Sequence, residues 1–375
     1  MLSLRLAVST GLASLLAITS CGADAPPPAA RSASAARSSA PRGARTASGG
    51  GGSSSAALGD SALEPAAVQA SDDADWERAE ALYRELVRRQ PRSATAKHGW
   101  GVALMHQQKS DQGIEALEQS VQLADNAQAR LDLAAAFGSV GRYPSALPHL
   151  RKAVELAPRQ PETWTALADA LVKVEKPDSA AETLRDSRKA CTTCPKNDAW
   201  NQVADEVARA SVTKAEGQLT SGDLPAARKS AEVAMKMRPN LPEGQLVAGK
   251  VARAEGDTKA AADAFRKVVE QTPDATTEPG AGARLELASL LIADGKGPEA
   301  VKLAEEVVAA HRDDPKALDA LGRACDATRN VDCARKVYGK LARLPAGQGD
   351  ASVKPAVEHA RLRMKQLKPR RKRRR

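Results

Sequence analysis

The chain has 375 residues, of which 56 are Lys or Arg, 46 are Asp or Glu, and only 2% are aromatic. Its formal net charge of +10 belongs to one end, because residues 361 to 375 hold ten Lys and Arg and no acid, while residues 1 to 360 balance at 46 against 46. The basicity is therefore a property of this tail, and no aromatic residue for base stacking accompanies it, which argues against nucleic-acid binding.

Residues 1–20 are predicted to be a lipoprotein-type signal peptide. One early cation, Arg5, precedes an apolar run to Ile18 that is too short to span a membrane. The residues Ile18-Thr19-Ser20-Cys21 resemble the bacterial lipobox, which implies that Cys21 is diacylated and becomes the mature N-terminus. Two or more acyl chains hold a protein stably at a bilayer, so Cys21 is the expected membrane attachment. The alternative is an ordinary signal, cleaved at Ala23-Asp24-Ala25, that leaves a free secreted protein.

Residues 21–60 are expected to form a disordered tether. They are almost wholly Ala, Ser, Gly, Pro and Arg, and include the run SGGGGSSS. Such a segment buries too little apolar surface to offset the entropy lost on ordering. A flexible chain of this length spans about 35 Å on average. The tether would let the following domain search the volume beside the membrane or cross part of a cell-wall layer.

A 34-residue repeat dominates the chain from about residue 60 to 346. In the segment from Leu131 to Pro158, two apolar stripes at helical spacing are separated by Gly141, which predicts a helix, a tight turn and a second helix. A small residue opens the second helix, because a close helix crossing leaves no room for a larger side chain. It recurs at intervals of 34, 33, 34, 47, 34, 39 and 34 residues, as Ala79, Gly113, Ala146, Ala180, Ala227, Ala261, Ala300 and Ala334.

Three further signals keep this register. A bulkier apolar residue usually follows the small residue by four places, as Tyr83, Leu117, Leu150, Leu184, Phe265 and Tyr338. Glycine precedes it by five where the turn needs a permissive backbone, at Gly141, Gly222, Gly256 and Gly295. Proline follows it by twelve where the helix stops, at Pro91, Pro158, Pro239 and Pro273.

This pattern resembles the tetratricopeptide repeat (TPR) family, whose 34-residue helix pairs stack into a superhelix. The first helices agree, with Trp164-Leu167-Ala168-Leu171 and Leu318-Leu321-Gly322 as examples. No TPLH-like turn indicates ankyrin repeats, and the unit is too short for HEAT repeats. The resemblance implies an all-α fold, a right-handed TPR superhelix (α-solenoid) of about 7–8 helix-turn-helix repeats. It also implies a concave groove, lined by the first helices, for a protein or peptide partner.

The repeats are predicted to form an N-terminal TPR block at 61–187 and a C-terminal TPR block at 210–346. The first unit has a poor first helix, since Pro65 and the acidic run Ser71 to Asp75 interrupt it. Residues 188–209 are an insertion that either extends the next first helix or forms an irregular loop, and are a possible block boundary. The Gly-rich segment Thr276 to Arg284 is expected to be a surface loop. Residues 347–367 should form a linker and a capping helix.

Besides Cys21, four cysteines form two local pairs, and an even number in an exported chain suggests disulfides. A bond between Cys325 and Cys333 would staple the last hairpin across its turn. Cys191 and Cys194 form a CxxC motif, for which a structural disulfide is favoured over free thiols or a redox-active pair. Haem attachment is excluded because proline follows the motif, and zinc would need a second ligand pair.

The sequence contains no catalytic motif, so no enzyme activity, cofactor or metal is expected. There is no phosphate loop, nucleophile elbow or dinucleotide fingerprint, and the five histidines lack metal-ligand spacing. Most of the histidines are expected at exposed helix positions. The predicted groove residues are mixed in sign and mostly short: His98, Val102, Met105, Leu131, Asp132, Thr165, Asp169, Lys250, Arg253 and Glu286.

Residues 368–375 form a basic tail that is expected to be disordered. Its cations are Lys368, Arg370, Arg371, Lys372, Arg373, Arg374 and Arg375. After export it would meet acidic lipid head groups, anionic envelope polymer or an acidic protein, or it is a solvated end with no dedicated partner.

The sequence as a whole predicts a non-catalytic, membrane-anchored TPR scaffold for protein–protein interactions, lipid-anchored in the bacterial cell envelope outside the cytoplasm. One alternative is an accessory subunit that recruits a cell-wall enzyme or anionic polymer through the basic tail. Another is a cytoplasmic nucleic-acid-associated repeat protein, if the N-terminal signal is misread.

Overall fold

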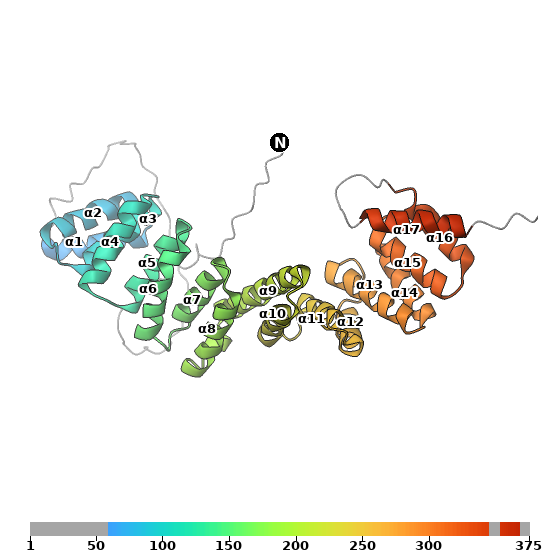
Figure 1. Cartoon of the computed structure of the whole chain (residues 1–375). Helices are drawn as coiled ribbons and strands as arrows, with labels where there is room; N and C mark the ends of the chain where they lie inside the picture. Colours follow the sequence, from blue (N-terminus) through green and yellow to red (C-terminus); the bar gives the residue numbers. More distant parts are fainter. Residues whose placement is uncertain (1–58, 345–352, 368–375) are drawn as a thin grey trace, which may run out of the picture. The chain divides into compact units, whose positions relative to one another are not determined.

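A computed structural model of the chain describes residues 59–344 and 353–367. The predicted signal peptide at 1–20, nearly all of the tether at 21–60 and the tail at 368–375 lie outside these ranges. Within them the secondary structure is helical throughout, as Figure 1 shows. The elements are α1 (Asp60–Asp72), α2 (Trp76–Arg89), α3 (Ala94–His106), α4 (Ser110–Leu123), α5 (Ala127–Ser139), α6 (Tyr143–Leu156), α7 (Pro161–Lys173), α8 (Pro177–Ala190), the 3-10 helix η3 (Cys194–Lys196), α9 (Asp198–Ser221), α10 (Leu224–Met237), α11 (Pro242–Ala254), α12 (Thr258–Gln271), α13 (Glu278–Ala293), α14 (Gly297–Ala310), α15 (Pro315–Ala327), α16 (Val331–Leu341) and α17 (Val353–Gln366).

The helices form two compact units, unit 1 up to Ala170 and unit 2 from Leu171. Odd-numbered helices are the first helices of the repeats, and even-numbered helices are the second. In unit 1 the first helices contact one another in the order α1, α3, α5, and in unit 2 in the order α9, α11, α13, α15, α17. Second helices pack against the first helices on either side of them in the chain, as α4 does against α3 and α5 and as α12 does against α11 and α13. The predicted all-α solenoid is therefore confirmed.

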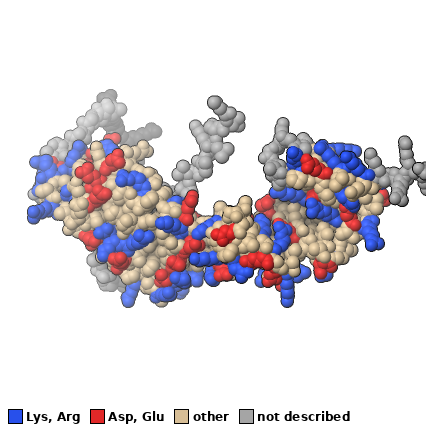
Figure 2. All heavy atoms as spheres, viewed as in Figure 1, with Lys and Arg blue, Asp and Glu red and all other residues tan. Residues whose placement is uncertain are grey.

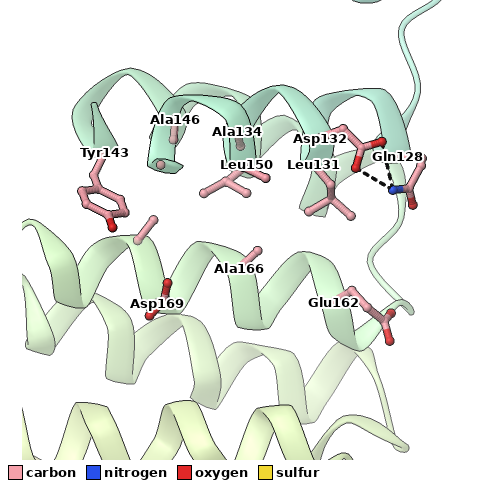
Figure 3. A pocket seen from close by; sticks show the side chains of 13 residues that line it. Gln128, Leu131, Asp132, Ala134, Tyr143, Ala146, Leu150, Glu162, Ala166 and Asp169 are labelled. Atoms are coloured by element: carbon pink, nitrogen blue, oxygen red, sulfur yellow. Dashed lines mark hydrogen bonds between the residues drawn. The ribbon is translucent and has the colours of Figure 1, made fainter. Parts of the chain in front are cut away.

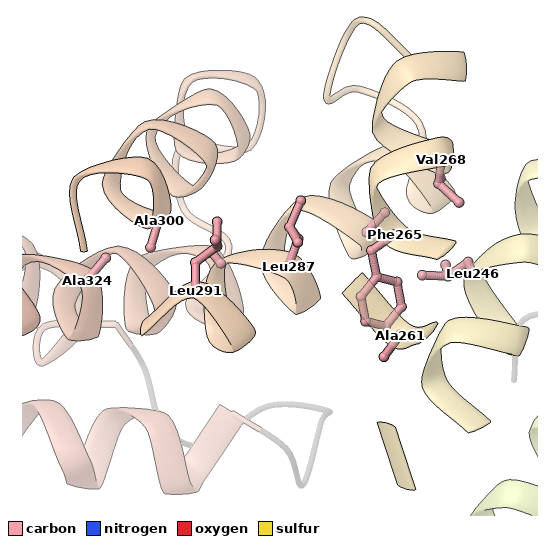
Figure 4. Close-up of a cluster of buried hydrophobic side chains, with 10 residues drawn as sticks. Leu246, Ala261, Phe265, Val268, Leu287, Leu291, Ala300 and Ala324 are labelled. Carbon is pink, nitrogen blue, oxygen red and sulfur yellow. The ribbon is translucent and has the colours of Figure 1, made fainter. Parts of the chain in front are cut away.

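The small residue that opens each second helix is buried in all eight repeats, at Ala79, Gly113, Ala146, Ala180, Ala227, Ala261, Ala300 and Ala334. The bulkier residue four places on packs against a glycine of a first helix in several repeats. A Cβ atom on Gly249 would lie 2.5 Å from the ring of Phe265, and one on Gly101 would lie 2.7 Å from Leu117. Figure 4 shows Phe265 with Ala261 in such a cluster in unit 2. Steric exclusion at the helix crossing thus explains the pattern in the sequence.

The turn between the two helices of each repeat has one residue with a left-handed backbone, five places before the small residue. The four glycines predicted there are confirmed, with φ of 73° at Gly141, 83° at Gly222, 87° at Gly256 and 76° at Gly295. The other four repeats hold non-glycine residues in the same conformation: Ala74 (57°), Gln108 (62°), Glu175 (59°) and Arg329 (57°). Since this conformation costs a non-glycine residue roughly 1–2 kcal/mol, packing of the helix pair sets the turn geometry whether or not glycine is present.

Side-chain caps begin many of the second helices directly after this turn. The carboxylate of Asp257 accepts a hydrogen bond from the Ala260 amide at 2.9 Å, and Asn330 caps Cys333 in the same way at 3.1 Å. A capping side chain satisfies one of the amides that has no partner within the first turn. In α2, α10, α12 and α16 the cap and the left-handed residue together fix where the second helix starts.

Two sequence-based expectations about irregular segments were wrong. Pro65 lies inside a continuous helix α1, which ends only at the acidic residues after Asp72. The segment from Thr276 to Arg284 is mostly helical, because α13 begins at Glu278. For the insertion at 188–209, the structure selects the first of the two alternatives: α9 has 24 residues, against 13 in α11.

The buried Arg284 fixes the short link between α12 and α13. Its side chain is 2% exposed, and its Nε lies 2.9 Å from a carboxylate oxygen of Glu306. It also donates hydrogen bonds to the carbonyls of Pro273 at 2.9 Å and Gly280 at 3.1 Å. A buried guanidinium requires partners of this kind to offset its desolvation. The link is therefore a defined structure that the helix α13 itself stabilises.

Helix α17 covers the last helix pair of unit 2. It buries Val357 and Ala360 against α15 and α16. Its other face is exposed and carries Lys354, Arg361 and Lys365. In Figure 2, Lys and Arg side chains gather over α16 and α17 on the visible face.

The left-handed turn gives a pair of opposed stability predictions in unit 1. Gln108→Gly should raise the free energy of unfolding by about 0.5–1 kcal/mol, because glycine adopts this backbone without strain. Gly141→Ala should lower it by about 1 kcal/mol, since the added methyl meets no atom within 4 Å and acts through the backbone alone. Urea unfolding followed by circular dichroism measures both changes. Equal midpoints for the two variants would contradict this account of the turn.

Candidate functional site

A groove in unit 1 lies along its first helices, and we name it the N-terminal groove. It consists of two adjoining cavities, which both include Gln128. One of about 400 Å³ lies between α1, α3 and α5, and the other, of about 40 Å³, lies between α5, α6 and α7. Because the first helices contact one another, their outward side chains form a continuous surface along the groove.

The floor of the smaller cavity is apolar and its edges are polar. Figure 3 shows Leu131 and Leu150 pointing toward α7 from above, with Ala166 opposite them. Asp132 from α5, and Glu162 and Asp169 from α7, also line the cavity. Small side chains on α7 therefore leave room between the helices, while carboxylates surround the opening.

Asp132 is held in place by two neighbours. His98 donates a hydrogen bond from Nε2 to its carboxylate at 2.7 Å, and Gln128 donates from Nε2 at 3.0 Å. His98 and Asp132 are 34 residues apart, so they occupy equivalent positions in adjacent repeats. The carboxylate is thereby oriented before any partner binds.

The lining of the N-terminal groove is acidic. Its charged side chains are Glu64, Asp132, Glu162 and Asp169, with His98 as the one imidazole. No Lys or Arg is among the lining residues of the two cavities. The electrostatic potential in this groove consequently favours cations.

A second groove, the C-terminal groove, lies in unit 2 and measures about 640 Å³. It is lined by α11, α13, α15 and the start of α17. Its four carboxylates are matched by four cations, and several of them pair. Arg253 forms an ion pair with Glu286, and Arg323 lies 2.7 Å from Asp319. Lys250 extends to Glu216 at 3.5 Å, one repeat earlier. This groove thus presents a balanced surface.

The structure distributes the ten predicted groove residues over three settings. His98, Leu131, Asp132 and Asp169 line the N-terminal groove, and Lys250, Arg253 and Glu286 line the C-terminal groove. Val102 is half-buried on α3. Met105 lies beside Gly113, where an added Cβ would be 2.7 Å from its sulfur. Thr165 is 6% exposed, and its hydroxyl donates to the carbonyl of Glu162 at 3.1 Å. Met105 and Thr165 therefore contribute to packing within the unit.

The sequence-based prediction omitted several groove residues, among them Glu64, Gln128 and Glu162. Glu64 belongs to α1, a helix whose sequence signal is weak because of Pro65. Glu162 lies 34 residues after Gln128, and both line the groove, so the repeat period alone could have identified the pair.

The five histidines are half-buried, so the prediction that most are exposed was wrong. Each packs against a specific neighbour. His98 binds Asp132, His106 stacks on Trp76 with ring centroids 3.7 Å apart, His149 contacts Arg130 and Phe137, His311 binds the carbonyl of Ala275, and His359 binds Asp319. No group of His, Cys, Asp and Glu in residues 59–344 and 353–367 could hold a metal ion.

The cysteines are paired in the structure as the sequence suggested. Cys191 is bonded to Cys194 between α8 and η3, and both are buried. Cys325 of α15 is bonded to Cys333 of α16, with a Cα–Cα distance of 5.8 Å. Neither bond lies in a groove, so both serve the helix connections.

No helix of the described ranges is long and apolar enough to cross a membrane.

Comparisons with known proteins identify the same repeats in the chain. Family models for the tetratricopeptide repeat match residues 65–191, 212–276 and 252–325. Among solved structures, the C-terminal part of a TPR repeat-containing protein from Cytophaga hutchinsonii has 15% identity, covering 69% of this chain and 99% of that chain, with a TM-score of 0.46. Yeast Tom70 has 14% identity, covering 84% and 66%, with a TM-score of 0.38. Pseudomonas aeruginosa pilF has 17% identity, covering 63% and 97%, with a TM-score of 0.37. No curated protein matches the chain.

Two half-buried histidines make the stability of unit 1 depend on pH. Burial lowers the pKa of His106, and burial together with Arg130 lowers the pKa of His149. The unfolded chain, with histidine pKa near 6.5, then binds more protons than the folded chain below that pH. Their contribution to stability is complete above pH about 6.5 and is lost as the pH falls below it.

We therefore expect the urea midpoint to decrease between pH 7.5 and pH 5.5. His106→Phe, which keeps an aromatic ring beside Trp76, combined with His149→Phe should reduce that decrease by at least half. An unchanged pH dependence in the double variant would rule out these two histidines as its cause.

Proposed function

Because the chain belongs to the tetratricopeptide repeat family, we propose that it is a non-catalytic, membrane-anchored scaffold that holds partner proteins in the bacterial cell envelope. Tetratricopeptide repeats support a role in protein–protein interaction. In addition to that role, we propose the membrane anchor, the location in the cell envelope and the absence of catalysis.

The observation that carries the scaffold role is the groove along the first helices of unit 1. Its floor is apolar, its edges carry carboxylates, and one of those carboxylates is fixed by His98 and Gln128. Pockets for side chains beside oriented polar groups suit an extended peptide or a partner helix. Alanines such as Ala135 and Ala166 leave space for the partner's side chains.

The anchor rests on the sequence before the described residues. Ile18-Thr19-Ser20-Cys21 resembles a lipobox, and a segment rich in Ala, Ser, Gly and Pro separates Cys21 from α1. A diacylated Cys21 would hold the protein stably at a membrane. The intervening segment would give the repeats freedom to meet their partners.

Photocrosslinking in intact cells tests the scaffold role. Thr95 is exposed and lines the N-terminal groove, whereas Glu118 is exposed on the second helix α4. A benzophenone amino acid at position 95 should capture at least one protein that the same group at position 118 does not. Identical captured proteins at both positions would remove the groove from the proposal.

Labelling with palmitate tests the anchor separately. The wild-type chain should incorporate label, fractionate with membranes, and have its processing blocked by globomycin. Cys21→Ala should lose the label and appear in the soluble fraction, while Cys191→Ala should keep the label. Membrane association that survives Cys21→Ala would contradict lipid anchoring at this residue.

A further inference from the structure

We propose that the exposed side of helix α17, together with the basic tail that follows it, is a second membrane contact, which binds the phosphate head groups of an anionic phospholipid bilayer. We name this side of the helix the outer face; its exposed residues include Lys354, Glu358, Arg361, Leu362 and Lys365. The contact goes beyond the proposed function, because it uses the other end of the sequence and does not depend on a lipid at Cys21.

The inner side of α17 holds the helix in one orientation. Val357 is fully buried against α15 and α16. Nδ1 of His359 lies 2.7 Å from a carboxylate oxygen of Asp319, and Arg363 forms an ion pair with Asp326 at 2.8 Å. The outer face is therefore presented to solvent as a defined surface.

Three cations lie on the outer face. Lys354, Arg361 and Lys365 are exposed, and their spacings of seven and four residues place them on one side of the helix. None of the three forms an ion pair with another residue that the structure describes. Glu358 is the one acid of α17, so the helix keeps an excess of positive charge. In Figure 2 this end of unit 2 shows Lys and Arg side chains gathered over α16 and α17.

An exposed leucine adjoins these cations. Leu362 is 55% exposed, the highest value among the large hydrophobic side chains of the described residues. At a bilayer surface, an apolar side chain enters the boundary between head groups and acyl chains while Lys and Arg bind the phosphates. A nucleic acid or an anionic polymer offers no apolar layer for this leucine. The combination of leucine and cations therefore favours a bilayer.

The tail adds charge where the outer face ends. Residues 368–375 begin directly after Leu367, and they hold seven cations and no acid. Clusters of about four to eight Lys and Arg beside a membrane contact are typical of binding to acidic lipids. The tail thus supplies most of the attraction, and the outer face supplies the surface that meets the bilayer.

The cations of the C-terminal groove are less suited to bind phosphate. Arg253 and Arg323 are paired with the carboxylates of Glu286 and Asp319. A phosphate group would have to displace these carboxylates. On the outer face no described carboxylate has to be displaced.

Co-sedimentation with vesicles tests the contact. The chain from residue 22 onward lacks the predicted signal peptide and Cys21, and it retains every described helix. At 50 mM salt it should bind vesicles of phosphatidylglycerol and phosphatidylcholine at least thirtyfold more strongly than vesicles of phosphatidylcholine alone. Binding should weaken at least tenfold at 300 mM salt, because exposed charges are screened. Equal binding to both kinds of vesicle, or none, would overturn the proposal.

Charge variants with the tail intact test the outer face itself. Lys354→Gln, Arg361→Gln and Lys365→Gln together should weaken binding to the phosphatidylglycerol vesicles at least tenfold, since each cation near an anionic bilayer contributes about fivefold. All three positions are exposed, so the fold should be retained, as circular dichroism would show.

A matched control removes the same charge elsewhere in unit 2. Lys229→Gln, Lys259→Gln and Lys267→Gln alter exposed positions of α10 and α12 and should change binding less than threefold. Equal weakening by the two triple variants would mean that the vesicles respond to net charge only. That result would overturn the assignment to the outer face.

A fluorescent group at position 362 distinguishes a bilayer from other polyanions. In the chain from residue 22 the four natural cysteines form disulfides, so Leu362→Cys supplies a free thiol for an NBD label. Its emission should shift to shorter wavelength on phosphatidylglycerol vesicles, because the group leaves water. The same label at Leu156→Cys, an exposed position of α6, should not shift. No shift at position 362 would overturn the proposal, as would tighter binding to duplex DNA than to the vesicles.

These outcomes are separate from those that test the proposed function. Palmitate labelling of Cys21 and capture of proteins from position 95 use neither the outer face nor the tail. Failure of the vesicle experiments would leave the scaffold and its lipid anchor standing.

Discussion

The close crossing of the two helices in each repeat is the constraint on which the rest of the structure depends. Ala261 and its seven equivalents are buried because the neighbouring helix backbone leaves space only for a small side chain. A single helix pair of this kind exposes apolar residues on both sides, so neighbouring pairs must stack to bury them. Stacking in turn aligns the first helices side by side. The faces of the first helices that remain uncovered form the grooves. The geometry of the grooves therefore follows from the helix packing that buries the core.

The same scaffold carries two different charge patterns. In unit 1 the groove lining is acidic, whereas in unit 2 the charges are balanced and partly paired. Several polar pairs join equivalent positions of adjacent repeats, as His98 with Asp132 and Lys250 with Glu216 do, both at a separation of 34 residues. Partner preference consequently depends on a few side chains of the first helices, which can change without disturbing the helix crossings.

The sequence was most informative where steric exclusion acts. The small residues, the four turn glycines and the helix-ending prolines follow from contacts that tolerate few alternatives, and the structure places them as predicted. The sequence was less informative where a neighbouring element determines the backbone conformation. Gln108 and Glu175 adopt the left-handed backbone although neither residue type prefers it, because the helix pair imposes the turn. Pro65 is accommodated within α1, and no local signal would have shown this.

The groove was predicted only in part, for a geometric reason. The repeat period identifies the helix to which a residue belongs. A shift of one position along that helix decides whether the side chain faces the groove or the next helix. Met105 and Thr165 lie on first helices as expected, yet they pack inside the unit. Glu162 lies on the open face and was overlooked. The orientation of each first helix is fixed by the stacking of whole repeats, which is information beyond any single motif.

The two disulfides join cysteines that are only 3 and 8 residues apart. Four cysteines allow three pairings, and this one closes the shortest loops, which cost the least chain entropy to form. Under oxidising conditions an extended chain would therefore favour the same two bonds as the folded protein. The native pairing needs no contact between distant repeats, so it places no constraint on the order in which the repeats fold.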